Sequence, residues 1–317
     1  MSTDKGSIAP PAEVRNKYTI LTIAFAGLGS MLYGWFSVII SPVLAMPSFI
    51  SHMGLDTAPN ARQLEGAISG LSQGGGLIGC FMSGYTSDRF GRRGAIFIAC
   101  LLGVLSGALQ AGAVNIGMFM AARFIAGLSV GNIQALVPTL MSEFAPPHSR
   151  GFLVGLHGVF ILLGCIMADW LGAAFFHVQN EGAQWRVPLA LQALWPLLLA
   201  SGIWFIPESP RWLLQKGRTV EALEVCKKLR AHSSDPDSTF AHSEFALMSA
   251  QWEQDRLLPS SWFSILTIPS YRKRAIIGFL TCFFGQTTGT LIIANYGPTI
   301  YGSLGFGVAD QLYFNAG

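Results

Sequence analysis

Long apolar runs of the length that an α-helix needs to cross a bilayer recur along this chain. A spanning helix takes about 20 mostly apolar residues. Seven runs meet this requirement, and they cover residues 19–45, 64–86, 94–114, 117–141, 152–173, 187–207 and 275–302. Helices in the core of soluble proteins are rarely this long without charge. We therefore expect an all-α polytopic membrane protein that lies in a lipid bilayer.

The charge content agrees with this fold class and excludes others. Charged residues make up 12% of the sequence, against about 25% in soluble domains. The 20 Lys and Arg residues lie in short segments between the runs, so we expect no nucleic-acid-binding surface. The five cysteines lack CxxC spacing, which indicates neither a disulfide framework nor a zinc site. The sequence holds no catalytic triad, metal-ligand cluster or phosphate-binding loop, so we predict no enzyme activity, metal or cofactor.

The positions of Lys and Arg predict the orientation of the chain, because basic residues stay on the cytoplasmic side during membrane insertion. A cytoplasmic N-terminus places most of the 20 basic residues inside, leaves Arg62 and Arg186 outside, and puts Arg123 within the fourth run. The polar residues 1–18 lack the apolar stretch of a signal peptide. We expect them to form a cytosolic tail.

The spacing of the runs predicts the domain organisation. Six runs fill residues 19–207, which we expect to form a six-helix transmembrane half. Residues 208–274 are polar and predict a cytosolic linker, in which residues 209–230 and 245–256 have the apolar spacing of amphipathic surface helices. Residues 275–317 hold the seventh run and predict the start of an incomplete second half.

A charged turn, residues 84–93, joins the second and third runs. Opposite charges that pair in one conformation and separate in another can hold a membrane gate closed. Retention of basic residues inside would explain the arginines, but it requires neither Asp88 nor Gly91. We therefore predict gating roles for the four charged residues of the turn, Asp88, Arg89, Arg92 and Arg93.

This turn, GYTSDRFGRR, resembles the loop signature of the major facilitator superfamily. Four further motifs narrow the resemblance to the sugar porter family, and within it to the fungal hexose transporters. They are RFIAG with Gly131 at residues 123–131, PTLMSE through RG at 138–151, WRVP at 185–188 and PESPRW at 207–212. Residues 285–298 resemble the seventh helix of the family, so we expect a chain truncated after that helix.

The resemblance implies a major facilitator fold, in which two six-helix halves enclose the substrate and access alternates between the two sides. It implies transport of a monosaccharide-like sugar, with protons as a further partner in symporters, and favours the plasma membrane. It also implies that Glu143, Arg150, Glu208 and Arg211 are cytoplasmic gate charges.

The first helix departs from the proton-coupled members of the family. Phe36 stands where they carry an acid, so Arg123 loses its expected partner. An ionisable residue within a span needs a partner or water, and Asp169 is the candidate at a suitable depth, although it can also be a simple interfacial residue beside Trp170. Facilitated diffusion and proton symport through Asp169 both remain open.

The expected sugar site departs as well. A hexose offers hydroxyl groups that need paired donors and acceptors. The family's glutamine on the fifth helix aligns with Gly158, next to His157, and the seventh helix retains Gln286, Asn295 and Tyr296. We predict that His157, Gln286, Asn295 and Tyr296 bind substrate, with a helix-packing role as the alternative for His157 and Gln286.

A second class of function is also considered, a non-transporting nutrient sensor or a truncated membrane protein that regulates a full-length relative. A seven-helix receptor fits the number of runs but explains neither the five motifs nor the long linker.

Overall fold

The structure is a computed structural model that describes residues 16–231, 235, 237–257 and 264–316. No strand occurs among these residues. The helices are α1 Lys17–Val38, α2 Ile40–Leu44, α3 Pro47–His52, α4 Ala61–Ala111, α5 Ile116–Phe144, α6 Arg150–Phe176, α7 Glu181–Leu191, α8 Leu194–Gly202, α9 Pro210–Gln215, α10 Thr219–Arg230, α11 Thr239–Asp255, α12 Ser264–Thr267, α13 Pro269–Thr287, α14 Thr290–Ser303 and α15 Val308–Ala316. The all-α prediction is thus confirmed.

Five helical stretches in the described part of the chain are long and apolar enough to cross a membrane. They are Lys17–Leu44, Ala61–Ala111, Ile116–Phe144, Arg150–Phe176 and Pro269–Ser303. The second and third predicted spans are the two arms of α4, which the non-helical Gly91 separates. Both arms pack at the same level of α5, because Gly79 approaches Leu128 and Gly103 approaches Ser129. The seventh predicted span is divided between α13 and α14, which meet at Gly289.

The sixth predicted span is divided into α7 and α8, and neither helix reaches spanning length on its own. Proline explains the break. Pro196 has no N–H group to donate to the carbonyl of Gln192, four residues earlier, so the helical hydrogen bonding is interrupted there. Hydropathy alone does not predict this break, because both halves are apolar.

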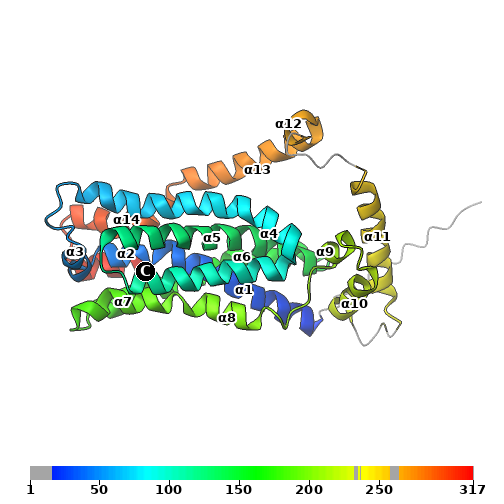
Figure 1. Ribbon diagram of the computed structural model, residues 1–317, viewed down its shortest axis with the longest axis horizontal. Helices are drawn as coiled ribbons and strands as arrows, with labels where there is room; N and C mark the ends of the chain where they lie inside the picture. The colour runs from blue at the N-terminus through cyan, green and yellow to red at the C-terminus, as the bar shows by residue number, and fades with distance from the viewer. Residues whose placement is uncertain (1–15, 232–234, 236, 258–263, 317) are drawn as a thin grey trace, which may run out of the picture.

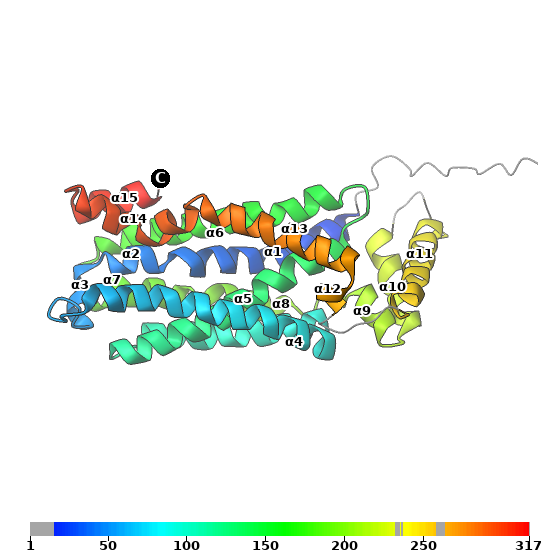
Figure 2. The same cartoon turned by 90° about the horizontal axis from the view of Figure 1, so that it is seen from above.

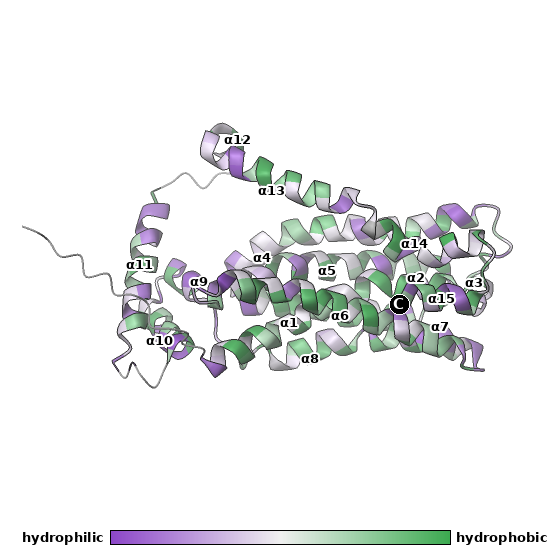
Figure 3. Ribbon diagram, turned by 180° about the vertical axis from the view of Figure 1, so that it is seen from behind, coloured by the Kyte–Doolittle hydropathy of each residue, from purple (hydrophilic) through white to green (hydrophobic). Residues whose placement is uncertain are grey.

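The helices form an elongated bundle with α9, α10 and α11 at one end and α3 at the other (Figures 1 and 2). We call these the α10 end and the α3 end. Hydrophobic residues extend along the bundle, and hydrophilic residues gather towards its ends and over α9–α11 (Figure 3). Large apolar side chains on the bundle are exposed, among them Leu21, Phe81, Phe152, Leu162 and Phe205. An apolar surface of this extent is typical of contact with lipid.

Close contact between α4 and α5 depends on glycine. A Cβ added at Gly127 would overlap the carbonyl oxygen of Ser72, and one at Gly131 would overlap that of Gly76. Small residues let two helix backbones approach closely in a membrane, where apolar contact alone drives little association. Gly70 of α4, by contrast, has no neighbour within 4 Å of such a Cβ.

The linker helices differ in their bounds from the prediction. A turn at Gly217, with φ +75°, divides the helix expected over residues 209–230 into α9 and α10. The helix expected over residues 245–256 begins earlier, as α11. Side chains of α9 and α10 form a small core of their own, from Trp212, Leu213, Leu214 and Ala222.

Candidate functional site

The kink of α4 places the charged turn against the segment that follows α8. Gly91 has φ +80° and ψ 175°, a backbone conformation that is essentially restricted to glycine. A Cβ at this position would also overlap the carboxylate of Glu208. Glycine therefore meets two requirements at once, the backbone conformation of the kink and the close approach of an acidic side chain.

The carboxylate of Glu208 caps the helical turn that begins after the kink. Its Oε1 accepts hydrogen bonds from the backbone N–H groups of Arg92 and Ser209, both at 2.9 Å, and its Oε2 accepts one from Arg93 at 3.3 Å. Free N–H groups at a helix start favour an anion. Burial raises the pKa of Glu208, and these hydrogen bonds and the charge of Arg93 partly offset the shift.

Arg92 connects this capped turn to α5. Its Nη2 lies 3.0 Å from Oε1 of Glu143 and its Nε lies 3.3 Å from Oε2, so the ion pair is bidentate. The pair is well buried, since the side chains of Arg92 and Glu143 are 14% and 8% exposed. Three predicted gate residues, Arg92, Glu143 and Glu208, are thereby brought together from three parts of the chain. We call Arg92, Arg93, Glu143 and Glu208 the charged cluster.

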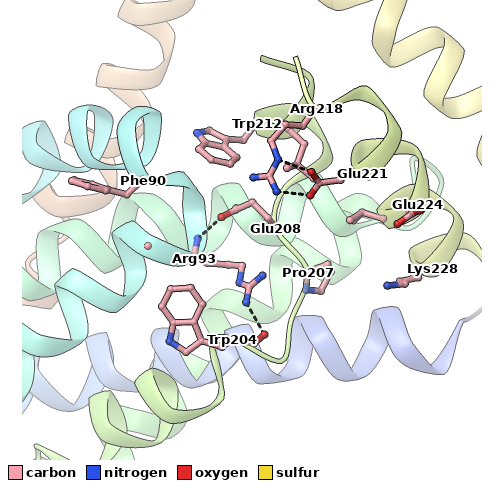
Figure 4. A pocket seen from close by; sticks show the side chains of 13 residues that line it. Phe90, Arg93, Trp204, Pro207, Glu208, Trp212, Arg218, Glu221, Glu224 and Lys228 are labelled. Atoms are coloured by element: carbon pink, nitrogen blue, oxygen red, sulfur yellow. Dashed lines mark hydrogen bonds and ion pairs between the residues drawn. The ribbon is translucent and has the colours of Figure 1, made fainter. Parts of the chain in front are cut away.

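Arg93 lies at the edge of a pocket of about 400 Å³ (Figure 4). Its guanidinium lies over the ring of Trp204, 5.0 Å from the ring centroid, and Nη2 donates to the Trp204 carbonyl at 2.6 Å. The remaining lining residues come from α4, the segment after α8, α9 and α10: Phe90, Gly94, Pro207, Glu208, Trp212, Leu213, Arg218, Glu221, Glu224, Val225 and Lys228. The pocket is therefore a junction between the bundle and the linker helices.

The other predicted gate residues lie outside the charged cluster. Asp88 is exposed, and its backbone carbonyl, not its carboxylate, accepts a hydrogen bond from the indole N–H of Trp212 at 3.1 Å. Arg89 is exposed, with its guanidinium over its neighbour Phe90. No salt bridge of Arg150 or Arg211 occurs among the described residues. The structure therefore does not bring these four side chains into the charged cluster.

Arg230 is a structural connection that the sequence reading missed. Its buried guanidinium donates to the carbonyls of Phe144 at 2.8 Å and Ala145 at 3.4 Å, and it forms an ion pair with Glu244 at 2.6 Å. The carbonyls at the end of a helix lack partners within that helix, so Arg230 of α10 caps α5 and joins it to α11. The amphipathic pattern of α10 suggested an exposed residue, and no local signal distinguishes this arginine from its neighbours.

The first helix also contacts the end of α10. The side-chain amide of Asn16 donates to the carbonyls of Lys228 and Leu229, at 2.8 and 3.1 Å. The hydroxyl of Thr19 donates to the Leu229 carbonyl at 2.5 Å. The last turn of α10 is therefore held between the start of α1 and the end of α5.

The expected pair of Arg123 and Asp169 is not formed in this structure. Arg123 is 2% exposed, and its Nε and Nη1 have no hydrogen-bond partner. Asp169 instead accepts a hydrogen bond from the side-chain amide of Asn315 at 3.0 Å, which joins α6 to α15. Phe36 is buried in the hydrophobic core of the bundle.

The predicted sugar-binding residues occupy two parts of the molecule. Nδ1 of His157 lies 2.7 Å from the hydroxyl oxygen of Ser30, so His157 joins α6 to α1. Gln286 is exposed on α13, whereas Asn295 and Tyr296 are half-buried on α14. No hydrogen bond joins His157 to Gln286 in the described part of the chain, so their shared role stays a prediction. Within the same residues, no group of three His, Cys, Asp or Glu side chains is arranged to hold a metal ion.

The fold thus defines an integral, multi-pass membrane protein, and the charged cluster joins its helices at one end of the bundle.

Comparisons with known proteins identify the family. Residues 22–317 match the family described as sugar (and other) transporters, and the chain belongs to this family. The MFS-type transporter criB of Aspergillus cristatus is 32% identical over 281 residues, which cover 89% of this chain and 59% of that protein. The arabinose-proton symporter of Bacillus subtilis is 31% identical and matches 92% of this chain and 60% of its own length. Hexose transporter 2 of Kluyveromyces lactis is 31% identical, with 94% and 54% covered.

A solved structure has the same fold. The proton:xylose symporter XylE bound to 6-bromo-6-deoxy-D-glucose superposes with a TM-score of 0.81 at 24% identity, covering 94% of this chain and 66% of that chain. This chain spans 54% to 60% of the length of the three curated relatives named above.

Proposed function

We propose that this protein transports a monosaccharide-like sugar across a membrane by alternating access. The family match over residues 22–317 is the observation that supports this most strongly. Two of the relatives are named for arabinose and hexose transport. The charged cluster supports the mechanism, because Arg92, Glu143 and Glu208 connect three parts of the chain at one end of the bundle. Such contacts hold that end in one arrangement and must change when it opens.

We propose that the α10 end faces the cytoplasm and that the protein resides in the plasma membrane. The basic residues support the orientation. Arg92 and Arg93 bond to Glu208, next to the linker helices that lie at this end and carry further Lys and Arg residues. The opposite orientation would place most basic residues outside. The choice of membrane is supported by the family resemblance alone.

Two coupling mechanisms remain as proposals. Facilitated diffusion is supported by Phe36, which cannot take up a proton, and by the absence of an Arg123–Asp169 pair in the described residues. Proton symport is supported by the position of Asp169, which is half-buried in a span and bonded to Asn315 of α15. Protonation of Asp169 would change a contact between two helices, as coupling requires.

We propose that His157, Gln286, Asn295 and Tyr296 contact the sugar. Each offers a hydrogen-bond donor or acceptor of the kind that a sugar hydroxyl needs. His157 already makes one hydrogen bond, to Ser30, which fixes its ring between α6 and α1. Its second ring nitrogen is then the group that would meet a substrate.

Uptake into proteoliposomes tests the proposal. The 317-residue chain is reconstituted, and the entry of labelled arabinose, xylose and glucose is measured with and without a protonophore. We expect saturable uptake of at least one sugar. Loss of accumulation with the protonophore would indicate symport, and unchanged uptake would indicate facilitated diffusion. Absence of saturable uptake for every sugar would contradict transport and favour a sensing or regulatory role.

A matched pair of variants tests the proposed contacts. Gln286→Ala is expected to raise KM several-fold, because a lost hydrogen bond to substrate costs on the order of 1 kcal/mol. Gln254→Ala, on the linker helix α11, serves as the control and should leave KM unchanged. Equal KM values for the two variants would remove Gln286 from the site.

A further inference from the structure

Arg123 is a cation enclosed within the bundle. It lies seven residues into α5, or ~10 Å from the α3 end of that helix at 1.5 Å per residue. Its side chain is 2% exposed, and Nε and Nη1 are buried without a hydrogen-bond partner. An uncompensated charge at such a position is very costly, so buried arginines are found with a partner.

No carboxylate of the spans supplies that partner in this structure. Glu65 and Glu143 lie near the ends of their helices, and Asp88 lies beside the α4 kink. Asp169 is the one acid placed well inside a span, and it is bonded to Asn315. The resemblance to proton-coupled porters places an acid at position 36, but the residue there is the apolar Phe36. The compensating charge is therefore missing from the described residues.

The bundle itself covers all but 2% of the Arg123 side chain, so a partner from outside the bundle meets little open surface there. The partner must therefore be small enough to lie among side chains.

Other donors in the bundle lack acceptors too. The indole N–H groups of Trp35 on α1 and Trp195 on α8 are buried and unpartnered, and their ring centroids lie 5.8 Å apart. Gln192, fully buried between α7 and α8, has neither of its side-chain polar atoms paired. Helix α1 packs on both α5 and α8. The bundle therefore encloses several buried N–H donors that lack an acceptor among the described residues.

We propose that a small monovalent anion of the halide class, drawn from solution, neutralises Arg123 inside the bundle. The anion accepts hydrogen bonds from the guanidinium and supplies the charge that the residue at position 36 does not. This site does not depend on the proposed transport activity, because it compensates a buried charge whether or not a sugar moves.

Thermal unfolding of the purified full chain in detergent tests the site. The protein is transferred from sodium gluconate to sodium chloride or bromide at constant ionic strength. Since a ligand that binds only the folded state stabilises it by mass action, we expect a saturable rise in Tm of about 2–5 °C with either halide. Phe36→Asp provides an internal carboxylate and should abolish the rise, and Arg123→Gln removes the charge and should do the same.

The outcomes are distinct. Equal Tm values in gluconate and halide for the wild-type chain would overturn the proposal, as would a halide effect of the same size in Arg123→Gln. A Tm rise caused by a sugar carboxylate such as glucuronate, with none from halide, would also overturn it. If one variant fails to fold, the other still decides, and bromide can be located directly by its anomalous scattering.

Discussion

Gly91 combines an unusual backbone conformation with a tight contact to Glu208. Its replacement should therefore destabilise the fold through both backbone strain and steric overlap. In Gly91→Ala, a non-glycine residue would occupy a region of φ and ψ that costs about 1–3 kcal/mol, and its Cβ would displace the carboxylate of Glu208. We expect a clear loss of thermal stability in detergent, measured as Tm. Gly84→Ala is the control, because Gly84 is helical with open space around it. Similar Tm values for the two variants would contradict this role.

Glu208 should give the fold a measurable dependence on pH. Burial raises its pKa above the ordinary glutamate value of 4.5, so in the range just above 4.5 the folded state holds a proton that the unfolded state releases. The contribution of Glu208 to the free energy of unfolding is therefore fully present below pH 4.5 and is lost as the pH rises through the raised pKa. We expect Tm to fall more steeply as the pH rises above 4.5 in the wild type than in Glu208→Gln.

The exposed Glu224→Gln, also on the rim of the pocket, is the matched control for removal of one negative charge. It should follow the wild-type curve. If Tm falls with pH in parallel for the wild type and Glu208→Gln, then Glu208 has the same pKa in the folded and the unfolded protein. That result would contradict the prediction.

At the residue scale, the sequence singled out the turn that contains Arg92 but did not predict the partners of that residue. Retention of basic residues on the cytoplasmic side does not explain Asp88 and Gly91. Their presence therefore drew attention to the turn that also contains Arg92. Nothing local specifies that the side chain of Arg92 binds Glu143 while its backbone N–H binds Glu208. Those contacts depend on how three helices pack, and the same reason explains why Arg230 was missed.

At the scale of elements, Arg230 connects α10 to α5 and α11, and its loss should loosen the linker helices. Cys226 reports on this, because it is buried in α10 and burial raises its pKa to about 11. Maleimide labelling at pH 8 should be slow, since the thiolate is the reactive form. In Arg230→Gln we expect labelling at Cys226, followed by mass spectrometry, to accelerate by on the order of 10-fold as local opening becomes easier.

Arg218→Gln provides the matched control, because it removes an exposed ion pair with Glu221 on the same helix. Exposed pairs contribute little, so labelling of Cys226 should stay slow. Equal acceleration in both variants would indicate a general effect of charge and not the connection to α5.

Apolar runs predicted the spanning elements, and two local features within them have physical causes. Runs two and three are the two arms of α4, which the non-helical backbone of Gly91 separates. Run six breaks near Pro196, where a backbone hydrogen bond is lost. Hydropathy measures neither effect, since it records composition and not hydrogen bonding.

At the scale of the whole molecule, the bundle from α1 to α8 has a buried core, whereas α13 has no buried residue among those described. The motifs predicted the family correctly. They did not predict where Gln286 and His157 lie relative to each other, because an apolar helix suits lipid and protein neighbours alike. The candidate sugar site therefore stays a prediction made residue by residue, whereas the charged cluster is observed as an assembled arrangement.

The central claim is that the protein carries a sugar by exposing one site alternately to the two sides of a membrane. Counterflow tests it most directly. Proteoliposomes loaded with a high concentration of an unlabelled sugar are diluted into a trace of the labelled sugar, and the label inside is followed in time. Alternating access predicts a transient accumulation of label above its outside concentration. Entry that never exceeds the level in empty vesicles, or no entry at all, would contradict the account.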